Sequence, residues 1–74
     1  MRLPRITSRE LVSALKRLGF VEARQTGSHL VLKRDQPPAR VVVPVHAGRV
    51  LKVGTLKAIL DEAGVSDEEL REAL

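Results

Sequence analysis

The sequence contains no cysteine, tryptophan or tyrosine, and Phe20 is its only aromatic residue. Without cysteine the chain has no disulfide, no thiolate nucleophile and no cysteine-based metal site. With a single aromatic ring it cannot stack successive bases as RNA-recognition motifs and OB-folds do, so any binding of RNA must depend on charge, shape and imidazole rings. The longest aliphatic cluster, residues 41–45, is interrupted by Pro44 and is too short to span a bilayer.

The charge that is present is unevenly distributed along a short chain. Residues 1–60 hold 12 Lys and Arg against three acids, whereas residues 61–74 hold one Arg against six acids. A folded basic body favours polyanions such as nucleic acid, although a solvated surface that keeps a small protein soluble explains it equally well. A chain of 74 residues indicates one domain, residues 1–74, with a modest core. Because the first residues open no apolar run, we expect a cytoplasmic protein that does not associate with a membrane.

The first periodic segment is typical of an amphipathic helix. Thr7 and Glu10 have the spacing of a capping box, and Gly19 can terminate a helix that runs from about Ser8 to Leu18. One stripe of this helix is apolar and is expected to be buried: Leu11, Val12, Leu15 and Leu18.

The opposite face of this helix is polar and carries Arg9, Ser13, Lys16 and Arg17. It fits either a solvated face or a row of phosphate contacts. A row of phosphate contacts fits Arg9 and Lys16 slightly better, whereas a solvated face fits Arg17 slightly better.

Three strands are expected next, at Phe20–Thr26, Ser28–Arg34 and Arg40–Val45. A tight turn at Thr26-Gly27 separates the first two, and residues 35–38, which include two prolines, break the second. Such short connections predict an antiparallel meander. Pro44 has no N–H to donate, so the third strand must either lie at an edge of the sheet or end at Pro44.

The last third of the chain reads as two helices. Gly54 or Thr55 can cap the first, which Gly64 stops, and its expected buried stripe is Leu56, Ile59, Leu60 and Ala63. A second capping box at Ser66 and Glu69 predicts a short acidic helix that Leu70 and Leu74 dock onto the core. The fold class is therefore α+β, in the order helix, three antiparallel strands, helix and short helix.

The candidate for chemistry is His29, at the start of the second strand. By alternation His29, Val31 and Lys33 face away from Leu30 and Leu32, so His29 lies on the open face if the two leucines are buried. Histidine can exchange a proton near neutral pH, which Lys, Arg and Glu cannot do unperturbed. Considered alone, however, His29 fits better as a surface histidine beside a turn that only satisfies a hydrogen bond.

Four motifs in register resemble the HicA family of bacterial toxin–antitoxin ribonucleases: Gly19-Phe20, Arg24-Gln25-x-Gly27-Ser28-His29, Pro44-x-His46 and Gly54-Thr55-Leu56-x-x-Ile59-Leu60. The resemblance implies a fold similar to the double-stranded-RNA-binding domain and cleavage of messenger RNA without a ribosome. It also implies silencing by a HicB antitoxin that covers His29 with acidic groups. We then expect a monomer when free and a hetero-oligomer with the antitoxin.

The family's essential histidine maps onto His29, which favours a catalytic over a purely structural role. Attack by a ribose 2′-hydroxyl needs a base, an acid for the leaving oxygen, and positive charge on the phosphate. Ser28 would position the phosphate or the ring, and Lys33 or Arg24 would stabilise the developing charge. The predicted RNA contacts are Arg24, Gln25, Gly27, Ser28, Lys33, Arg9 and Lys16. Gly27 is explained equally well by the positive φ angle that a tight turn requires.

Other features leave alternatives open. His46 fits a second proton-transfer partner, but a structural role at the sheet edge or beneath the following loop is favoured. The start of the second long helix, with Lys52 and Lys57, fits a phosphate site or ordinary capping. Two histidines without cysteine make a poor zinc site, so no metal or cofactor is expected. A non-catalytic RNA-binding module remains the alternative to an endoribonuclease.

Overall fold

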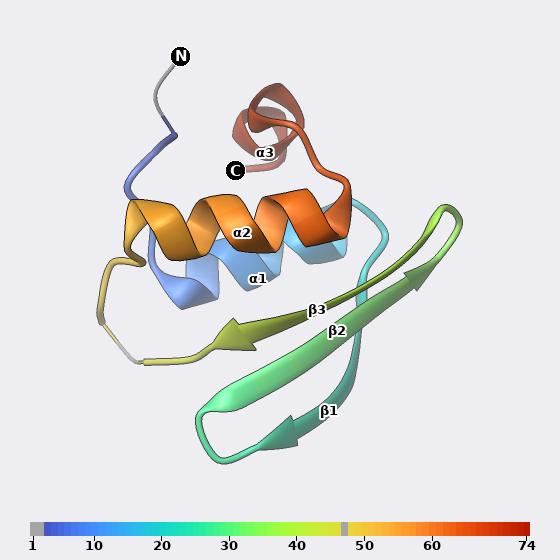
Figure 1. Cartoon of the computed structure of the whole chain (residues 1–74), viewed down its shortest axis with the longest axis horizontal. Coiled ribbons are helices and arrows are strands. Elements are labelled where there is room, and N and C mark those ends of the chain that lie inside the picture. Colours follow the sequence, from blue (N-terminus) through green and yellow to red (C-terminus); the bar gives the residue numbers. More distant parts are fainter. Residues whose placement is uncertain (1–2, 47) are drawn as a thin grey trace.

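The computed structural model describes residues 3–46 and 48–74. The chain forms, in order, α1 (Ser8–Arg17), β1 (Val21–Thr26), β2 (His29–Asp35), β3 (Pro38–Pro44), α2 (Val53–Ala63) and α3 (Asp67–Ala73). The strands make one antiparallel sheet in the order β1-β2-β3 (Figure 1). The predicted α+β class and element order are therefore confirmed.

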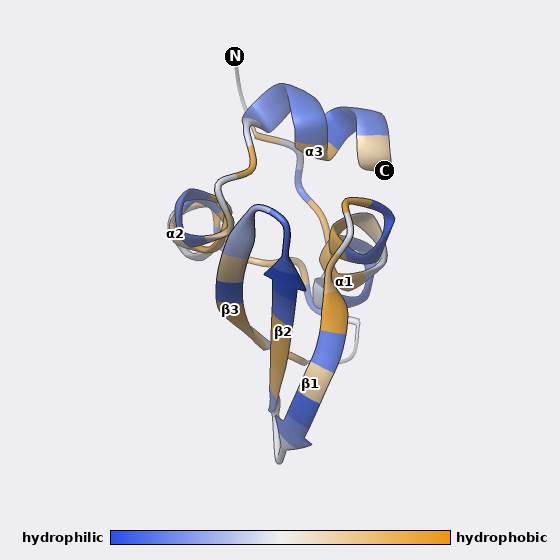
Figure 2. Ribbon diagram, turned by 90° about the vertical axis from the view of Figure 1, so that its right-hand side faces the viewer, coloured by the Kyte–Doolittle hydropathy of each residue, from blue (hydrophilic) through white to orange (hydrophobic). Residues whose placement is uncertain are grey.

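The two long helices lie on one side of the sheet, with α2 packed mainly against β3 (Figures 1 and 2). The short helix α3 covers α1 and α2 on the side away from the sheet. Alternate strand residues point into the core between sheet and helices: Leu30, Leu32, Val41 and Val43. We call the other side of the sheet the open face; it carries His29, Val31 and Lys33 with their cross-strand neighbours.

Most helix predictions are confirmed, and two details are wrong. The stripe Leu56, Ile59, Leu60 and Ala63 is buried as predicted, and α2 ends at Gly64 in the left-handed conformation. Neither Gly54 nor Thr55 caps α2, because the helix already begins at Val53. The N–H of Leu51 bonds to the carbonyl of Ile6 at 2.8 Å, which holds the chain just before Lys52, the residue at the N-cap.

Leu74 is the second correction. It does not dock with Leu70, which is fully buried, but is 45% exposed. Ala73 lies three residues after Leu70 on the same helical face and is buried instead. Leu74 itself is the C-cap of α3.

The predicted strand boundaries shift by at most two residues, and the largest shift is at the start of β3, which begins at Pro38 and not at Arg40. Phe20 is buried in the core and precedes β1 rather than opening it. The β2–β3 ladder continues to the pair Asp35 and Pro38, so only two residues form the turn. Pro44 is the last residue of an edge strand, as predicted.

The capping box at the start of α3 gives a testable acid sensitivity. The backbone N–H of Ser66 donates to the Glu69 carboxylate at 3.0 Å, and the Ser66 hydroxyl accepts from the Glu69 N–H at 3.1 Å. The bond from the Ser66 backbone N–H to the carboxylate, with a smaller contribution from the Ser66 side chain, lowers the pKa of Glu69. A lowered pKa in the folded state stabilises the fold above the unfolded pKa, and the effect is lost as pH falls through the folded value.

Replacing Ser66 by alanine should therefore lower the free energy of unfolding by about 1 kcal/mol at neutral pH, because α3 loses its N-cap. Glu69→Gln should lower stability at neutral pH and leave it less dependent on acid pH than in the wild type. Urea unfolding between neutral and acid pH measures both effects. Equal acid sensitivity of wild type and Glu69→Gln would contradict the role of this carboxylate.

Candidate functional site

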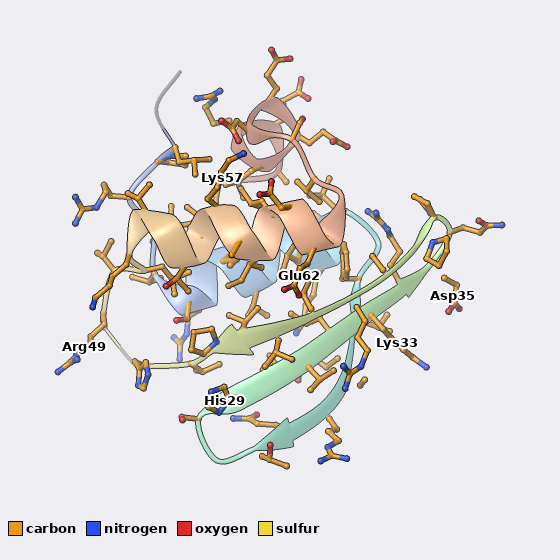
Figure 3. The ribbon with its side chains drawn as sticks, viewed as in Figure 1. His29, Lys33, Asp35, Arg49, Lys57 and Glu62 are labelled. Carbon is orange, nitrogen blue, oxygen red and sulfur yellow. The ribbon has the colours of Figure 1, made fainter. Side chains whose placement is uncertain are left out.

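His29 begins β2 directly after the two-residue turn formed by Gly27 and Ser28. Leu30 and Leu32 are buried in the core, so His29 lies on the open face, where it is exposed. Figure 3 shows His29 toward the same end of the molecule as Arg49, and Lys33 farther along the sheet. The expected placement of His29 on the open face is therefore observed.

The turn that carries His29 is tied to two other parts of the fold. The N–H of Val45 donates to the carbonyl of Ser28 at 2.6 Å, which extends the ladder by one step beyond His29 and Pro44. The hydroxyl of Ser8, a buried residue at the start of α1, donates to the carbonyl of Pro44 at 2.6 Å. These bonds hold His29 in a fixed relation to the N-terminus of α1.

Gly27 leaves the approach to this turn open. Its φ of 54° is one that L side chains rarely adopt, and a Cβ added there would meet nothing within 4 Å. Glycine is thus explained by conformation. The same space leaves the backbone beside His29 accessible to a ligand.

The strand register separates the two candidate cations. Thr26 lies opposite His29 and Arg24 lies opposite Val31, so Arg24 is a diagonal neighbour of His29 on the open face, at about 7–8 Å between backbones. Lys33 is four residues farther along β2, roughly 13 Å away. Arg24 can therefore reach a phosphate beside the imidazole, whereas Lys33 lies too far along β2 to reach the same one.

Two other predicted contacts lie away from His29. Gln25 pairs with Leu30 and is on the opposite face of the sheet. Lys16 forms an ion pair with Glu22, near the start of β1 and the far end of the sheet. Arg9, in contrast, is exposed beside Ser8, at the end of α1 that approaches Pro44.

The open face also holds residues that the sequence reading did not select. Arg40 lies opposite Lys33, and Val42 lies opposite Val31. Val42 is 40% exposed and Val21, opposite Lys33 on β1, is 56% exposed. The alternation of β3 combined with a two-residue turn would have identified Arg40 and Val42, but the turn was predicted to be longer. The open face thus carries exposed valines on its two edge strands and a cation on each of the three strands: Arg24, Lys33 and Arg40.

His46 is exposed and lines two adjoining hollows of about 390 and 340 Å³. The first hollow lies against the start of α1 and is lined by Thr7, Ser8, Arg9, Val45, His46 and Gly48. The second reaches the start of α2 and is lined by Ser8, Pro44, His46, Arg49, Val50, Leu51, Lys52 and Thr55. We refer to these two as the His46 hollows. Being exposed, the ring is not packed beneath the loop to α2.

The acidic end of the chain lies away from these features. Most of its carboxylates belong to α3, which sits beyond the helices on the side away from the sheet (Figure 2). The acidic segment therefore does not screen the open face. Within residues 3–46 and 48–74, no three His, Asp or Glu side chains converge into a group that could hold a metal ion.

The comparison with protein families identifies the chain. The family described as the HicA toxin of bacterial toxin–antitoxin systems matches residues 8–65, which span α1 through the end of α2 and all three strands. No curated protein matches the chain. In the part of the chain that the structure describes, no helix has the length and apolarity needed to traverse a bilayer.

Proposed function

Because this chain belongs to the HicA family, the toxins of bacterial toxin–antitoxin systems, we propose that it is an endoribonuclease that cleaves messenger RNA without a ribosome and without a metal. The observation that carries the proposal is the exposed His29 imidazole. It follows a turn that is held by a hydrogen bond to Val45, and Arg24 is its diagonal neighbour. An imidazole in the open can reach a ribose hydroxyl and the adjoining phosphodiester.

Cleavage would proceed by attack of the ribose 2′-oxygen on the adjacent phosphorus. The O2′–P bond forms, the P–O5′ bond breaks, and the products are a 2′,3′-cyclic phosphate and a 5′-hydroxyl. His29 takes the 2′-hydroxyl proton, gives a proton as imidazolium to the leaving 5′-oxygen, or does both in turn; where it does only one, water carries the other proton. Arg24 stabilises the charge that builds up on the phosphate, and Ser28 positions the phosphate or the ring.

A non-catalytic RNA-binding module is the second candidate. The observation in its favour is the open face itself, where exposed Val21 and Val42 lie among cations. Such a face can hold RNA without reacting with it. In that case His29 would be one binding contact among several.

Chemically modified RNA distinguishes the two candidates. The purified protein should cut an RNA oligonucleotide and leave a 2′,3′-cyclic phosphate, identified by mass spectrometry. A single 2′-deoxyribose at the cut site should stop cleavage there while the affinity for the oligonucleotide stays within about threefold. Binding of both RNAs without cleavage of either would support the non-catalytic module. Cleavage at the deoxy position would contradict attack by the 2′-hydroxyl.

Cleavage should also persist in excess EDTA. The proposed steps use only imidazole, guanidinium and hydroxyl groups, so removing divalent ions should change the rate by less than about threefold once ionic strength is matched. The measurement is the initial rate with and without the chelator. Complete loss of activity that Mg²⁺ restores would overturn the mechanism.

The partner would be a HicB-type antitoxin acting in the cytoplasm, where messenger RNA is available. An antitoxin that presents carboxylates interspersed with apolar side chains would match the open face and cover His29. We expect a monomer alone and a hetero-oligomer with the antitoxin. A structure of the complex in which His29 remains accessible would count against this mode of silencing.

A further inference from the structure

RNA bound at His29 can continue in two directions. One runs along the open face toward Lys33 and Arg40, which lie opposite each other on β2 and β3. The other runs past Pro44 to the His46 hollows, between the starts of α1 and α2. Figure 3 shows Lys33 and Arg49 toward opposite ends of the molecule, so the two directions diverge from His29.

The charges of the His46 hollows fit a polyanion. Their lining includes Arg9, Arg49 and Lys52 together with the His46 ring, and none of the lining residues in the described part of the chain is acidic. Cations without carboxylate partners remain available for phosphate oxygens. The open face also carries cations, Arg24, Lys33 and Arg40, but there they are interspersed with valines.

The walls of the hollows are fixed by backbone contacts. Thr7 and Val50 form a bridge between the segment before α1 and the segment before α2, beside the bond from Leu51 to Ile6. The N–H of Arg49 donates to the carbonyl of His46 at 3.1 Å. The cations therefore project from a preformed surface, which lowers the entropy lost when a ligand binds.

The start of α2 adds donors to the second hollow. Within the described residues, no side chain caps this helix, whereas Thr7 caps α1 and Ser66 caps α3. N–H groups in the first turn of α2 are thus left for another acceptor. Lys57 does not share this site, because its ammonium lies 3.3 Å from the Asp61 carboxylate, one turn farther along α2.

From these contacts we propose that the His46 hollows bind the backbone phosphates of the RNA strand next to the bond cleaved at His29. The strand then leaves His29 toward the starts of α1 and α2 and not along the open face. Arg49 and Lys52 hold phosphates by charge, and His46 contributes a hydrogen bond or a stacking surface. This inference rests on the proposed ribonuclease function and adds the path of the substrate.

Two charge-matched double variants in a His29→Ala background test this path, because that protein should bind RNA without cutting it. Arg49→Ala/Lys52→Ala should raise the Kd for a fluorescent RNA oligonucleotide at least tenfold. It should also reduce the slope of log K against log salt concentration by about 1.4, as expected for two lost phosphate contacts on a single strand. Lys33→Ala/Arg40→Ala removes the same charge and should change the Kd less than threefold. Lys57→Ala, measured alone, should have no effect.

The opposite ranking would place the RNA on the open face, and equal losses in the two double variants would show that the RNA does not prefer the His46 hollows; either result would overturn the proposal. Failure of the His29→Ala protein to bind RNA would overturn it too. All replaced side chains are exposed, and thermal unfolding checks that each variant is folded. If the expected ranking holds but the wild type does not cleave, the subsite stands and the ribonuclease function fails.

A substitution of His46 in the otherwise wild-type enzyme separates binding from chemistry. His46→Gln should raise KM and leave kcat within about threefold, because the residue touches phosphates or bases beyond the cleaved bond. A fall in kcat with unchanged KM would instead assign His46 to proton transfer and overturn its role in the subsite.

Discussion

Replacing His29 by alanine should abolish RNA cleavage, with a loss of rate of about 10²–10⁴-fold, the range for removal of a general acid or base. The ring is exposed, and of its two cross-strand neighbours Thr26 is exposed and Pro44 half-buried. The free energy of unfolding should therefore change by less than about 0.5 kcal/mol. Affinity for RNA should largely remain, because the cations near the turn are unchanged.

The measurement compares purified wild type and His29→Ala in the same cleavage assay and in an assay of growth inhibition on expression in bacteria. Lys57→Ala is a matched surface control, since Lys57 lies on α2 beside Asp61 and away from the turn. It should retain full activity. Equal cleavage by wild type and His29→Ala would refute the assignment, whereas lost binding with lost cleavage would favour the RNA-binding module.

Local patterns predicted the secondary structure well because each element carries its own signals. The capping boxes at Thr7 and Ser66 both form as predicted, and the alternation of β2 placed His29 on the correct face. The predicted N-cap of α2 was wrong. The hydrogen bond from the Leu51 N–H to the Ile6 carbonyl, which joins residues distant in sequence, holds the chain just before the start of that helix. No local pattern carries that information.

The site was only partly predictable for the same reason. The turn and His29 are adjacent in sequence, so the motif contains them. Which cations surround His29 depends on strand register, which favours Arg24 over Lys33 and places Gln25 on the other face. The His46 hollows depend on how α1 and α2 meet the end of β3, which requires the tertiary structure.

Arg34 is the residue whose structural importance the sequence analysis missed, although one signal was present. Like Leu30 and Leu32, it occupies a core-facing position of β2, where alternation predicts an apolar side chain. It lies at the edge of the core and is partly buried. Its guanidinium donates to the carbonyls of Pro37 at 2.9 Å, Ala63 at 3.0 Å and Leu18 at 3.3 Å.

These bonds join parts of the fold that are distant in sequence. Leu18 and Ala63 lie at the C-terminal ends of α1 and α2, whose last carbonyls lack partners within the helix. The guanidinium carbon is also 4.5 Å from the centre of the Phe20 ring. The planar guanidinium of Arg34, with its several N–H donors, suits this arrangement, and the ammonium group of a lysine cannot reproduce it.

Arg34→Ala should consequently lower the free energy of unfolding by about 3 kcal/mol, because it removes charged hydrogen bonds and leaves two helix-end carbonyls unsatisfied. A chain of this size has a total stability of roughly 4–11 kcal/mol, so the loss should lower Tm by roughly 12–24 °C. Arg34→Lys should recover less than half of it. Arg40→Ala, exposed on β3, is the charge-matched control and should shift stability by less than about 0.5 kcal/mol. Full stability of Arg34→Lys would show that charge alone suffices, and full stability of Arg34→Ala would contradict the role of these bonds.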